Sequence, residues 1–422
     1  MTDRMPCRAS MFVAVKKRKP ADDKPVVLVL QKLTDAKRAL RSVRYPVGWV
    51  TAGSLWRWMV NAGLQLLQAL LFARHGYRRR DFRRIVVYTV GILGDNTVML
   101  PSLAALRRAY PNADITLLVN TQTWDAVGAR ELLDGLPFFN RWQQVNDNLL
   151  RRRGVHFVLD RQQVGDLRAE LFINFSPFGN RGWLGAVLRE LALAKKLGAT
   201  HAVGFRVSGP RFALPWLIRN EPRRGAEILA ALGLTPEQEC LPINQPARDS
   251  IRAKCAYSEK LAVIHPGAKF KIQEWPAERF GKVASALAVR GFRPVVTGTA
   301  GEWATAEAVC RASDGVALNL AGQTSVAELV ELLRMSALCV TNDTGTMHLA
   351  ALLNVPTVAL FTMRNSPCHW FPNALRVQVL CSPVSCGLCF LDGDDCPQHK
   401  RCLTNISVTD VIQAAEKVWH NA

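Results

Sequence analysis

The sequence predicts an α/β protein of two doubly wound, Rossmann-like domains that face a cleft, preceded by a basic N-terminal extension. Its 422 residues exceed the roughly 250–300 residues beyond which a single core stops growing. From Ile85 onward, short β-branched runs alternate with helical patterns, as in parallel sheets. This periodicity lapses between about residues 242 and 260. We therefore expect an extension with an amphipathic helix over 1–84, an N-terminal domain over 85–250 and a C-terminal domain over 251–422.

Most of the positive charge lies in the extension. The chain has 54 Lys and Arg against 34 Asp and Glu, a net charge of +20. Residues 1–84 hold 19 of these cations and five of the acids, and so carry +14. Such a balance favours an anionic partner, which can be nucleic acid, a membrane surface or a phosphorylated small molecule. Nucleic acid ranks last and we expect none, because no interleaved aromatics or known binding module accompany the charge.

The amphipathic helix is expected over residues 55–72. Arg57, Asn61, Gln65 and Gln68 form one polar stripe on an otherwise apolar helix. A basic helix that carries Trp suits anionic headgroups, while packing against the α/β body is an equal alternative. No secretory signal opens the chain, because Lys16 to Lys19 break the first apolar stretch. We expect a cytoplasmic protein that is peripheral on the inner membrane.

The strands and helices follow in order along both domains. In the first, strands are expected at 85–88, 115–119 and 171–175, with helices at about 97–110 and 183–197. In the second, strands are expected at 261–264, 292–296, 338–340 and 357–361. Its helices are expected at 276–290, 302–312, 325–334, 347–353 and 408–419.

Ligands of doubly wound sheets bind at the carboxyl ends of the strands, and three loops there carry informative residues. The first loop holds Gly91, Gly94, Asp95 and Asn96 directly after a strand. Its glycines could cradle a phosphate at a helix start, although they lack the third glycine of a dinucleotide fingerprint. From the local sequence alone, Asp95 is better explained as a helix cap.

The second loop joins a strand end to a helix start through basic residues. Its candidate donor-binding residues are His265, Gly267, Lys269, Lys271 and Gln273. The lysines could reach an anion that the backbone amides also face, or they could belong to a solvated surface loop.

The third loop turns from a strand into a short helix. It holds Asp343, Thr344, Gly345, Thr346 and His348. Amides that head a helix suit a phosphate. Taken alone, His348 on an apolar helix is more typical of a packed histidine than of a catalytic one.

Five cysteines crowd one segment near the C-terminus, and four of them have the spacing of a metal site. Cys386, Cys389, Cys396 and Cys402 could hold a structural zinc or iron ion in a tetrahedral all-cysteine site. Reduced cysteines that bind no metal are the alternative in a reducing compartment.

The three loops together resemble glycosyltransferase family 9, the ADP-heptose:lipopolysaccharide heptosyltransferases. The resemblance runs over about residues 85–418 and is most specific in the Asn-Asp-Thr-Gly-x-Met-His block from Asn342 to His348. The other matching stretches are Gly94-Asp95, Thr97 to Pro101, His265 to Ala268, Trp275-Pro276, Leu320 to Gly322 and Cys402-Leu403.

This resemblance implies the GT-B fold, with the acceptor bound mainly by the N-terminal half and the nucleotide-sugar by the C-terminal half. Asp95 would be the general base that activates an acceptor hydroxyl, beside the acceptor-side loop residues Gly91, Gly94 and Asn96. Asp343, Thr344 and Gly345 would contact the donor. The implied reaction is inverting transfer of heptose from ADP-heptose to lipopolysaccharide core, with no cofactor and no metal in the chemistry.

One position departs from the family pattern. Many members have a lysine two residues before the Trp-Pro pair, where this chain has Gln273. Lys269 or Lys271 could supply the missing cation, or the donor could differ. Two alternatives therefore stay open: a GT-B transferase with another nucleotide-sugar and another glycan or protein acceptor, and a non-catalytic binding protein that kept the fold.

Overall fold

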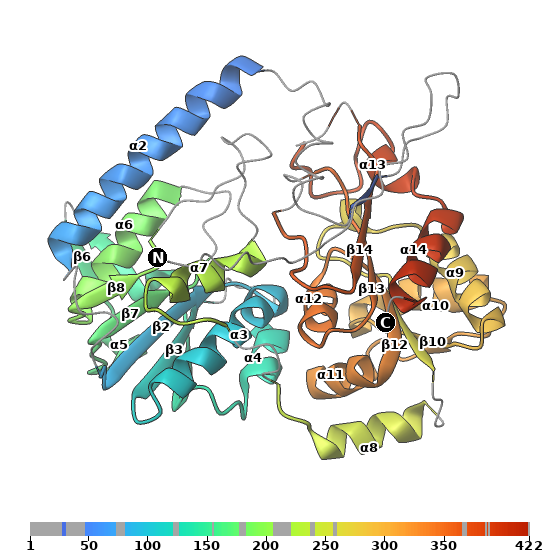
Figure 1. The fold of residues 1–422 in the computed structure, drawn as a ribbon, viewed down its shortest axis with the longest axis horizontal. Coiled ribbons are helices and arrows are strands. Elements are labelled where there is room, and N and C mark those ends of the chain that lie inside the picture. Colours follow the sequence, from blue (N-terminus) through green and yellow to red (C-terminus); the bar gives the residue numbers. More distant parts are fainter. Residues whose placement is uncertain are drawn as a thin grey trace, which may run out of the picture. The chain divides into compact units, whose positions relative to one another are not determined.

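The computed structural model divides the chain into two compact α/β units (Figure 1). One unit runs from Pro46 to Ile243, and the other gathers residues from Asn244 onward together with a short strand from the first 45 residues. The structure describes residues 28–30, 47–72, 81–120, 126–153, 156–176, 183–205, 221–236, 241–255, 260–364, 369–384, 386 and 389–420.

The N-terminal unit is built on a five-stranded parallel sheet in the order β4-β3-β2-β7-β8. Its strands are β2 (Arg84–Val90), β3 (Asp114–Asn120), β4 (Arg141–Val145), β7 (Leu171–Asn174) and β8 (His201–Val203). The central strands β2, β3 and β7 are apolar and buried along nearly their whole length, as expected where helices cover both faces of a sheet. A small antiparallel pair, β5 (Leu150–Arg153) and β6 (His156–Leu159), lies apart from the sheet.

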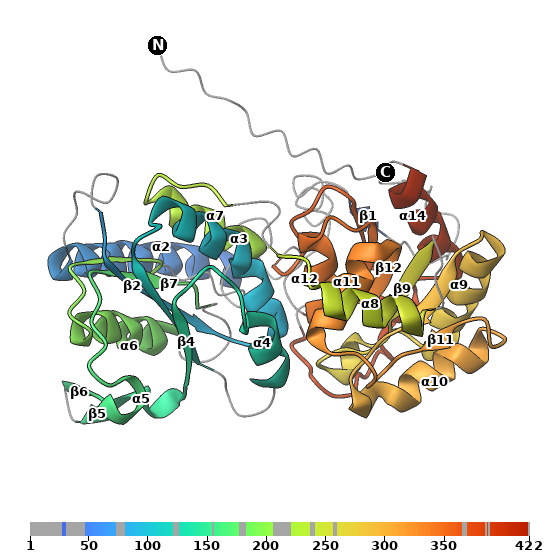
Figure 2. The same cartoon turned by 90° about the horizontal axis from the view of Figure 1, so that it is seen from below.

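Helices cover both faces of this sheet (Figures 1 and 2). The longer ones are α2 (Val47–Leu71), α3 (Leu93–Ala109), α4 (Ala126–Leu133), α6 (Trp183–Lys196) and α7 (Arg224–Ala230). The helices α2 and α6 share one hydrophobic core with Val86, Leu118 and Phe172 of the sheet. The short helices are η1 (Asp147–Leu149), α5 (Arg161–Val164) and η4 (Glu221–Arg223).

The C-terminal unit has a seven-stranded sheet in the order β1-β14-β13-β12-β9-β10-β11. All pairs are parallel except β1 with β14. The strands are β1 (Leu28–Leu30), β9 (Leu261–His265), β10 (Arg293–Val296), β11 (Leu318–Asn319), β12 (Ser336–Asn342), β13 (Thr357–Leu360) and β14 (Val377–Cys381).

Helices also cover this second sheet. The longer ones are α8 (Gln245–Lys254), α9 (Ala277–Val289), α10 (Trp303–Ala312), α11 (Val326–Met335), α12 (Gly345–Leu352) and α14 (Val408–His420). The side chains of α9, α10 and α14 fill one core with the sheet, and α12 belongs to a second cluster on its other side. Short turns of helix are η5 (Lys271–Gln273), η6 (Ala300–Glu302) and α13 (Arg401–Thr404).

In each sheet the strand order reverses beside the strand that begins the alternation of strands and helices. This strand is β2 in the N-terminal unit and β9 in the C-terminal unit. The reversal falls between β2 and β7 in the N-terminal unit and between β9 and β12 in the C-terminal unit. This is the doubly wound arrangement expected from the sequence, and it is confirmed in each unit. Such reversal points are where ligands of open α/β sheets bind.

The residues expected to form a separate extension over 1–84 are divided between the two units. Strand β1 pairs antiparallel with β14 at the edge of the C-terminal sheet. Helix α2 instead packs on the N-terminal unit, where Leu64 and Phe72 are buried. Strand β1 joins the C-terminal unit because the open edge of its sheet offers unpaired backbone groups. Helix α2 joins the N-terminal unit because its apolar face is buried there. The unit boundary lies at Ile243 and Asn244, a few residues before the expected one.

No helix in the described part of the chain combines the length and the apolar character required to cross a bilayer. The arginines that follow α2 in the sequence, Arg74 and Arg78 to Arg80, lie outside the described residues, as does the stretch at Lys16 to Lys19.

Candidate active site

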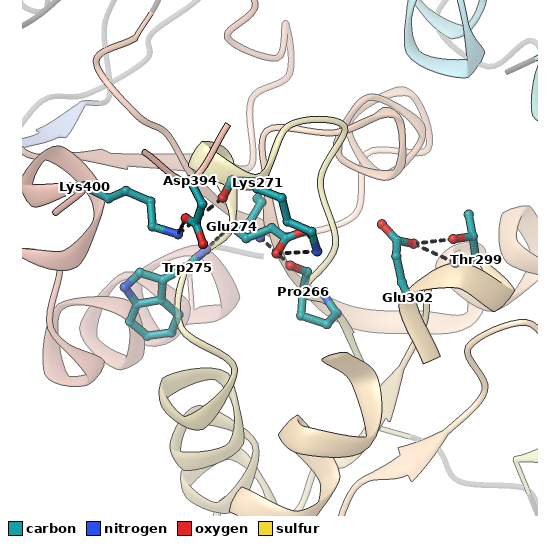
Figure 3. Close-up of polar contacts among 9 residues, drawn as sticks. Pro266, Lys271, Glu274, Trp275, Thr299, Glu302, Asp394 and Lys400 are labelled. Carbon is teal, nitrogen blue, oxygen red and sulfur yellow. Dashed lines mark hydrogen bonds and ion pairs between the residues drawn. The ribbon is translucent and has the colours of Figure 1, made fainter. Parts of the chain in front are cut away.

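The second and third predicted loops meet at the reversal point of the C-terminal sheet. Asn342, the last residue of β12, is buried, and its side-chain amide donates to the carbonyl of Pro266 at 2.7 Å. The side-chain oxygen of Asn342 accepts from the backbone N–H of Trp275 at 3.3 Å. One asparagine thus ties the loop after β9 to the end of β12, around Pro266 and Trp275 (Figure 3).

Asp343 and Gln273 are in direct contact. The Gln273 side-chain amide donates to a carboxylate oxygen of Asp343 at 2.8 Å. Burial raises the pKa of Asp343 to about 7, although the charge of Arg364 and the hydrogen bond from Gln273 both act to lower it. Near neutral pH this carboxyl is therefore partly protonated, whereas a solvated aspartate is ionised.

The backbone amides that head α12 lie next to this pair. Thr344 is the extended residue that precedes Gly345, and Thr346 is buried in the first turn. His348 is also buried, and burial lowers its pKa to about 4, so its ring is neutral at pH 7. That ring packs edge-on to Trp370 at 5.9 Å. Its contribution would be packing or a neutral hydrogen bond rather than a positive charge.

His265 is the last residue of β9, and Gly267 lies in the loop that follows it. The Nδ1 of His265 lies 3.1 Å from the hydroxyl of Thr297, and burial lowers the pKa of the ring. A Cβ on Gly267 would lie 1.9 Å from a carboxylate oxygen of Glu302. Glu302 also accepts from the N–H and hydroxyl of Thr299 at 2.7 and 3.0 Å, as Figure 3 shows. The Glu302 carboxylate thus packs over the backbone of Gly267, and a side chain there would have to displace it.

The two lysines of the loop are exposed. Lys271 pairs with the carboxylate of Glu274 at 3.0 Å (Figure 3). Lys269 lies 5.5 Å from the centroid of the Phe270 ring. The positive charge that acts on Asp343 comes instead from Arg364, which the sequence reasoning did not single out. Glu302 was missed as well, although Thr299 and Glu302 have the spacing of a capping box after a strand.

The first predicted loop lies at the reversal point of the N-terminal sheet. Asp95 is in the first turn of α3, and one of its oxygens accepts from the backbone N–H of Ile92 at 2.9 Å. Gly91 has φ +141°, and a Cβ there would lie 2.1 Å from the same oxygen. The buried Asn96 donates to the carbonyls of Gly91 and Ile92 at 3.3 and 2.9 Å. Gly94 is buried in the same turn. The capping role anticipated for Asp95 is thus real.

A buried polar cluster lies beneath the same sheet edge and was missed from the sequence. Glu190 on α6 accepts from Asn174 at 2.7 Å and from Ser176 at 3.2 Å. Burial raises the pKa of Glu190 to about 7, against the opposing effect of its hydrogen bonds and two arginines. Burial and Glu190 together raise the pKa of Tyr88. An acid on the apolar stripe of a helix, between Val187 and Ala194, was the available signal.

The cysteine segment contains no described group of three or more His, Cys, Asp or Glu side chains placed to hold a metal. Cys386 and Cys389 are exposed, whereas Cys402 is buried, and burial raises its thiol pKa to about 11. Two acids of the same segment make ion pairs. Asp392 pairs with Arg364, and Asp394 pairs with Lys400 at 2.6 Å (Figure 3).

Comparison with known sequences points to one family. Residues 227–399, which are 173 of the 422 residues, match the sequence model of glycosyltransferase family 9 (heptosyltransferase). The matched range includes the loops around Gln273 and Asp343.

Two curated relatives illustrate how far the family similarity extends. Lipooligosaccharide heptosyltransferase 2 of Haemophilus influenzae is 35% identical over 101 residues, which cover 23% of this chain and 29% of that protein. The match thus spans less than a third of that relative. Lipopolysaccharide heptosyltransferase 3 of Escherichia coli K12 is 22% identical over 343 residues, which cover 77% of this chain and 95% of that protein.

The fold is also shared with a solved family 9 structure. The structure of E. coli ADP-heptose lps heptosyltransferase II superposes with a TM-score of 0.55 at 20% identity, covering 80% of this chain and 99% of that one. At this identity the likeness establishes the fold, which is GT-B.

Proposed function

We propose that this chain is an inverting glycosyltransferase that moves a heptose from ADP-heptose to the core of lipopolysaccharide. Three observations support the proposal: the match of residues 227–399 to the family 9 model, similarity to relatives named as heptosyltransferases, and candidate residues at the reversal points of both sheets. The observation that carries it is the loop cluster around Asn342, Asp343 and the head of α12, which has the chemistry of a diphosphate site.

In the proposed reaction, the Asp95 carboxylate takes the proton of an acceptor hydroxyl. That oxygen attacks the anomeric carbon of the donor from the face opposite the diphosphate. The new C–O bond forms as the bond from the anomeric carbon to the phosphate oxygen breaks, and ADP leaves. A positioned carboxylate typically contributes about 10²–10⁴-fold to such a proton transfer. The hydrogen bond from Ile92 would orient the Asp95 carboxylate.

On the donor side, the amides of α12 would receive the charge that develops on the diphosphate. They are fixed by the helix and need no reorganisation during the reaction, which is the main source of electrostatic catalysis. Thr344 and Gly345 would lie against the phosphates, and Asp343 against the sugar. Glu302, which is partly exposed, would accept hydrogen bonds from donor hydroxyls.

A different nucleotide-sugar is the second candidate, and Gln273 is the observation that favours it. This side chain is neutral where many family members carry a lysine, and it is held by Asp343. A changed donor would leave the transfer chemistry intact and alter only which sugar and which acceptor are used.

The test is a transfer assay with purified protein, ADP-heptose and a lipid A–Kdo or heptosylated core acceptor. We expect release of ADP together with a product one heptose heavier. The Asp95→Asn variant should lose at least about 100-fold in kcat while it binds ADP as the wild type does. Asp166→Asn, which removes an exposed carboxylate of the same unit, is the matched control. Transfer from another nucleotide-sugar but not from ADP-heptose would support the second candidate. No transfer with any donor would contradict both.

A further inference from the structure

We infer that Arg364 binds the diphosphate of the donor, as the cation of a site in which Gln273 offers only a neutral amide. The inference rests on the proposed function, since it concerns the nucleotide-sugar of that same reaction. It assigns a binding role to a residue that lies 91 positions from Gln273 and outside the three predicted loops.

Topology brings Arg364 to the same sheet edge as Asp343. Strands β12 and β13 are parallel neighbours, with Asn342 opposite Leu360. Asp343 follows the end of β12, and Arg364 follows the end of β13 by four residues. Both side chains therefore leave the sheet at its carboxyl edge, beside the reversal point where β12 meets β9.

The guanidinium of Arg364 is held firmly in place. It lies over the ring of Phe270 with 4.3 Å between the guanidinium carbon and the ring centroid. Its Nε donates to the carbonyl of Leu391 at 2.6 Å, and a terminal nitrogen pairs with Asp392. Phe270 is the residue that precedes η5, which carries Gln273. The cation is thereby packed against the loop that holds the Asp343 contact.

The charge of Arg364 reaches Asp343, and in the described part of the chain it is the cation whose field acts on that carboxyl. The effect is mutual, because Asp343 and Asp392 both act to raise the pKa of Arg364 against the effect of burial. Neither loop lysine fills this role. Lys271 is 63% exposed and paired with Glu274, and Lys269 is exposed beside Phe270.

The site can accept more negative charge than its two carboxylates supply. The Arg364 side chain is only 6% exposed, whereas that of Asp392 is 61% exposed and so partly screened by water. Asp343 has a pKa near 7 and is partly protonated at neutral pH. Of its two carboxylate neighbours, Asp392 is thus screened by water and Asp343 is partly protonated. The buried guanidinium therefore favours the binding of a further anion.

The experiment measures nucleotide binding by calorimetry for the wild type and Arg364→Gln. The probes are ADP, AMP and adenosine, with UDP, GDP and their monophosphates in parallel. We expect Arg364→Gln to weaken the preferred diphosphate by about tenfold or more, and the free nucleoside by less than about twofold. Arg290→Gln, which removes an arginine paired with Glu416 on the surface of the same unit, should change neither. Equal weakening of diphosphate and nucleoside, or no weakening, would overturn the inference.

Two further variants separate phosphate binding from support of the neighbouring loop. If Arg364 acts only by holding Asp392, then Asp392→Asn should weaken the diphosphate as much as Arg364→Gln does. We expect instead that Asp392→Asn binds the diphosphate as tightly as the wild type or more tightly. Adding Gln273→Lys to Arg364→Gln should restore at least part of the lost affinity, because it returns a cation beside Asp343. Failure of both expectations would overturn the inference.

The same panel distinguishes this inference from the proposed function. Preference of the wild type for UDP or GDP over ADP would refute the proposed donor and still test Arg364 on the preferred nucleotide. Absence of binding to all three diphosphates would overturn both.

Discussion

The carboxylate of Asp95 accepts the N–H of Ile92 at 2.9 Å while it occupies the space that a Cβ on Gly91 would need. A cap and a catalytic base are therefore compatible roles, since the cap fixes the carboxylate at the strand end. In the other unit, burial raises the pKa of Asp343, and the charge of Arg364 and the hydrogen bond from Gln273 act against it. In both places the surroundings of the acid determine what it can do.

Gly91→Ala tests whether the position of Asp95 matters apart from its presence. The new Cβ would displace the Asp95 carboxylate and also strain a backbone at φ +141°. Gly135→Ala is the matched control, because Gly135 has φ +79° but open space around it. Each variant should lose about 1–3 kcal/mol of unfolding free energy from strain. Only Gly91→Ala should also lose kcat, by about tenfold or more, in the transfer assay. Equal kcat values would show that the placement of Asp95 is unimportant.

Glu190→Gln tests the buried acid of the N-terminal unit through the pH dependence of stability. The pKa of Glu190 is about 7 in the folded protein, against 4.5 for an ordinary glutamate. Between these values the folded chain keeps a proton that the unfolded chain has lost, so folding weakens as pH rises. The variant should therefore gain stability relative to the wild type from about pH 4.5 to 7, by at most about 1.4 kcal/mol per pH unit.

Denaturant unfolding at several pH values measures this difference. Exposed Glu131→Gln in α4 is the control and should show no comparable gain over the same window. A pH-independent difference for Glu190→Gln would mean that Glu190 is ionised in the folded protein throughout.

At the scale of elements, helices α9 and α10 pack closely enough to exclude a methyl group. A Cβ on Gly281 would lie 2.5 Å from the Cβ of Ala312 and 2.7 Å from the carbonyl oxygen of Val309. Both obstacles belong to α10 and include backbone, so they cannot rotate away. The loop after β9 and the loop after β10 both depend on these two helices for their position.

Gly281→Ala should therefore destabilise the C-terminal unit by about 1–3 kcal/mol, the usual cost of overpacking. Gly63→Ala in α2 is the matched control, since nothing lies within 4 Å of its position. It should stabilise the protein by about 0.5–1 kcal/mol, because alanine is the better helix former. Thermal unfolding of both variants gives the comparison, and a stable Gly281→Ala would contradict the packing described.

Buried strands could be predicted from the sequence, and exposed elements could not. Strand β9 is an apolar run that is buried throughout, and it was expected within one residue. Strand β4 reads Arg-Trp-Gln-Gln-Val and is mostly unburied at a sheet edge, so it lacks that signal. Helix α8 lies where a lapse was expected, because it buries only Ala247 and Ile251. Its capping by Asn244 was the remaining clue.

The same distinction applies to the candidate site. The three loops could be predicted because glycines and polar residues directly follow apolar strands. The roles of Arg364 and Glu190 depend on which strands and helices become neighbours. Arg364 reaches Asp343 only because β13 lies beside β12, and Glu190 reaches Asn174 only because α6 packs over β7. Such neighbours are set by the tertiary fold.

At the scale of the whole chain, the amphipathic helix expected over residues 55–72 had two possible roles, binding to anionic headgroups and packing against the α/β body. One face of α2 packs on the N-terminal unit, where Gln68 donates to the carbonyl of Ala202 at 2.6 Å. The opposite face leaves Met59, Leu66 and Leu70 exposed by 50%, 57% and 74%. Packing on the α/β body is thus observed. The prediction of a peripheral association with anionic lipid rests on these exposed apolar side chains and on the net charge of +20.

The double variant Leu66→Glu with Leu70→Glu tests this membrane association. It places two charges on the exposed apolar face without touching the packed one. Binding to vesicles that contain anionic lipid should fall by about tenfold or more, with unchanged thermal stability. Gln65→Glu, a charge change on the exposed polar part of the same helix, is the control and should have a much smaller effect. Equal binding of the double variant and the wild type would contradict a role for α2 at the membrane.

The central claim is that this chain adds a heptose to the lipopolysaccharide core with Asp95 as the base. Mass spectrometry of the core from a strain that lacks the gene tests it most directly, after complementation with the wild type or with Asp95→Ala. The account predicts a core one heptose shorter in the deletion strain, restored by the wild type and not by Asp95→Ala. A core of unchanged mass would contradict the lipopolysaccharide assignment, and restoration by Asp95→Ala would contradict the assigned base.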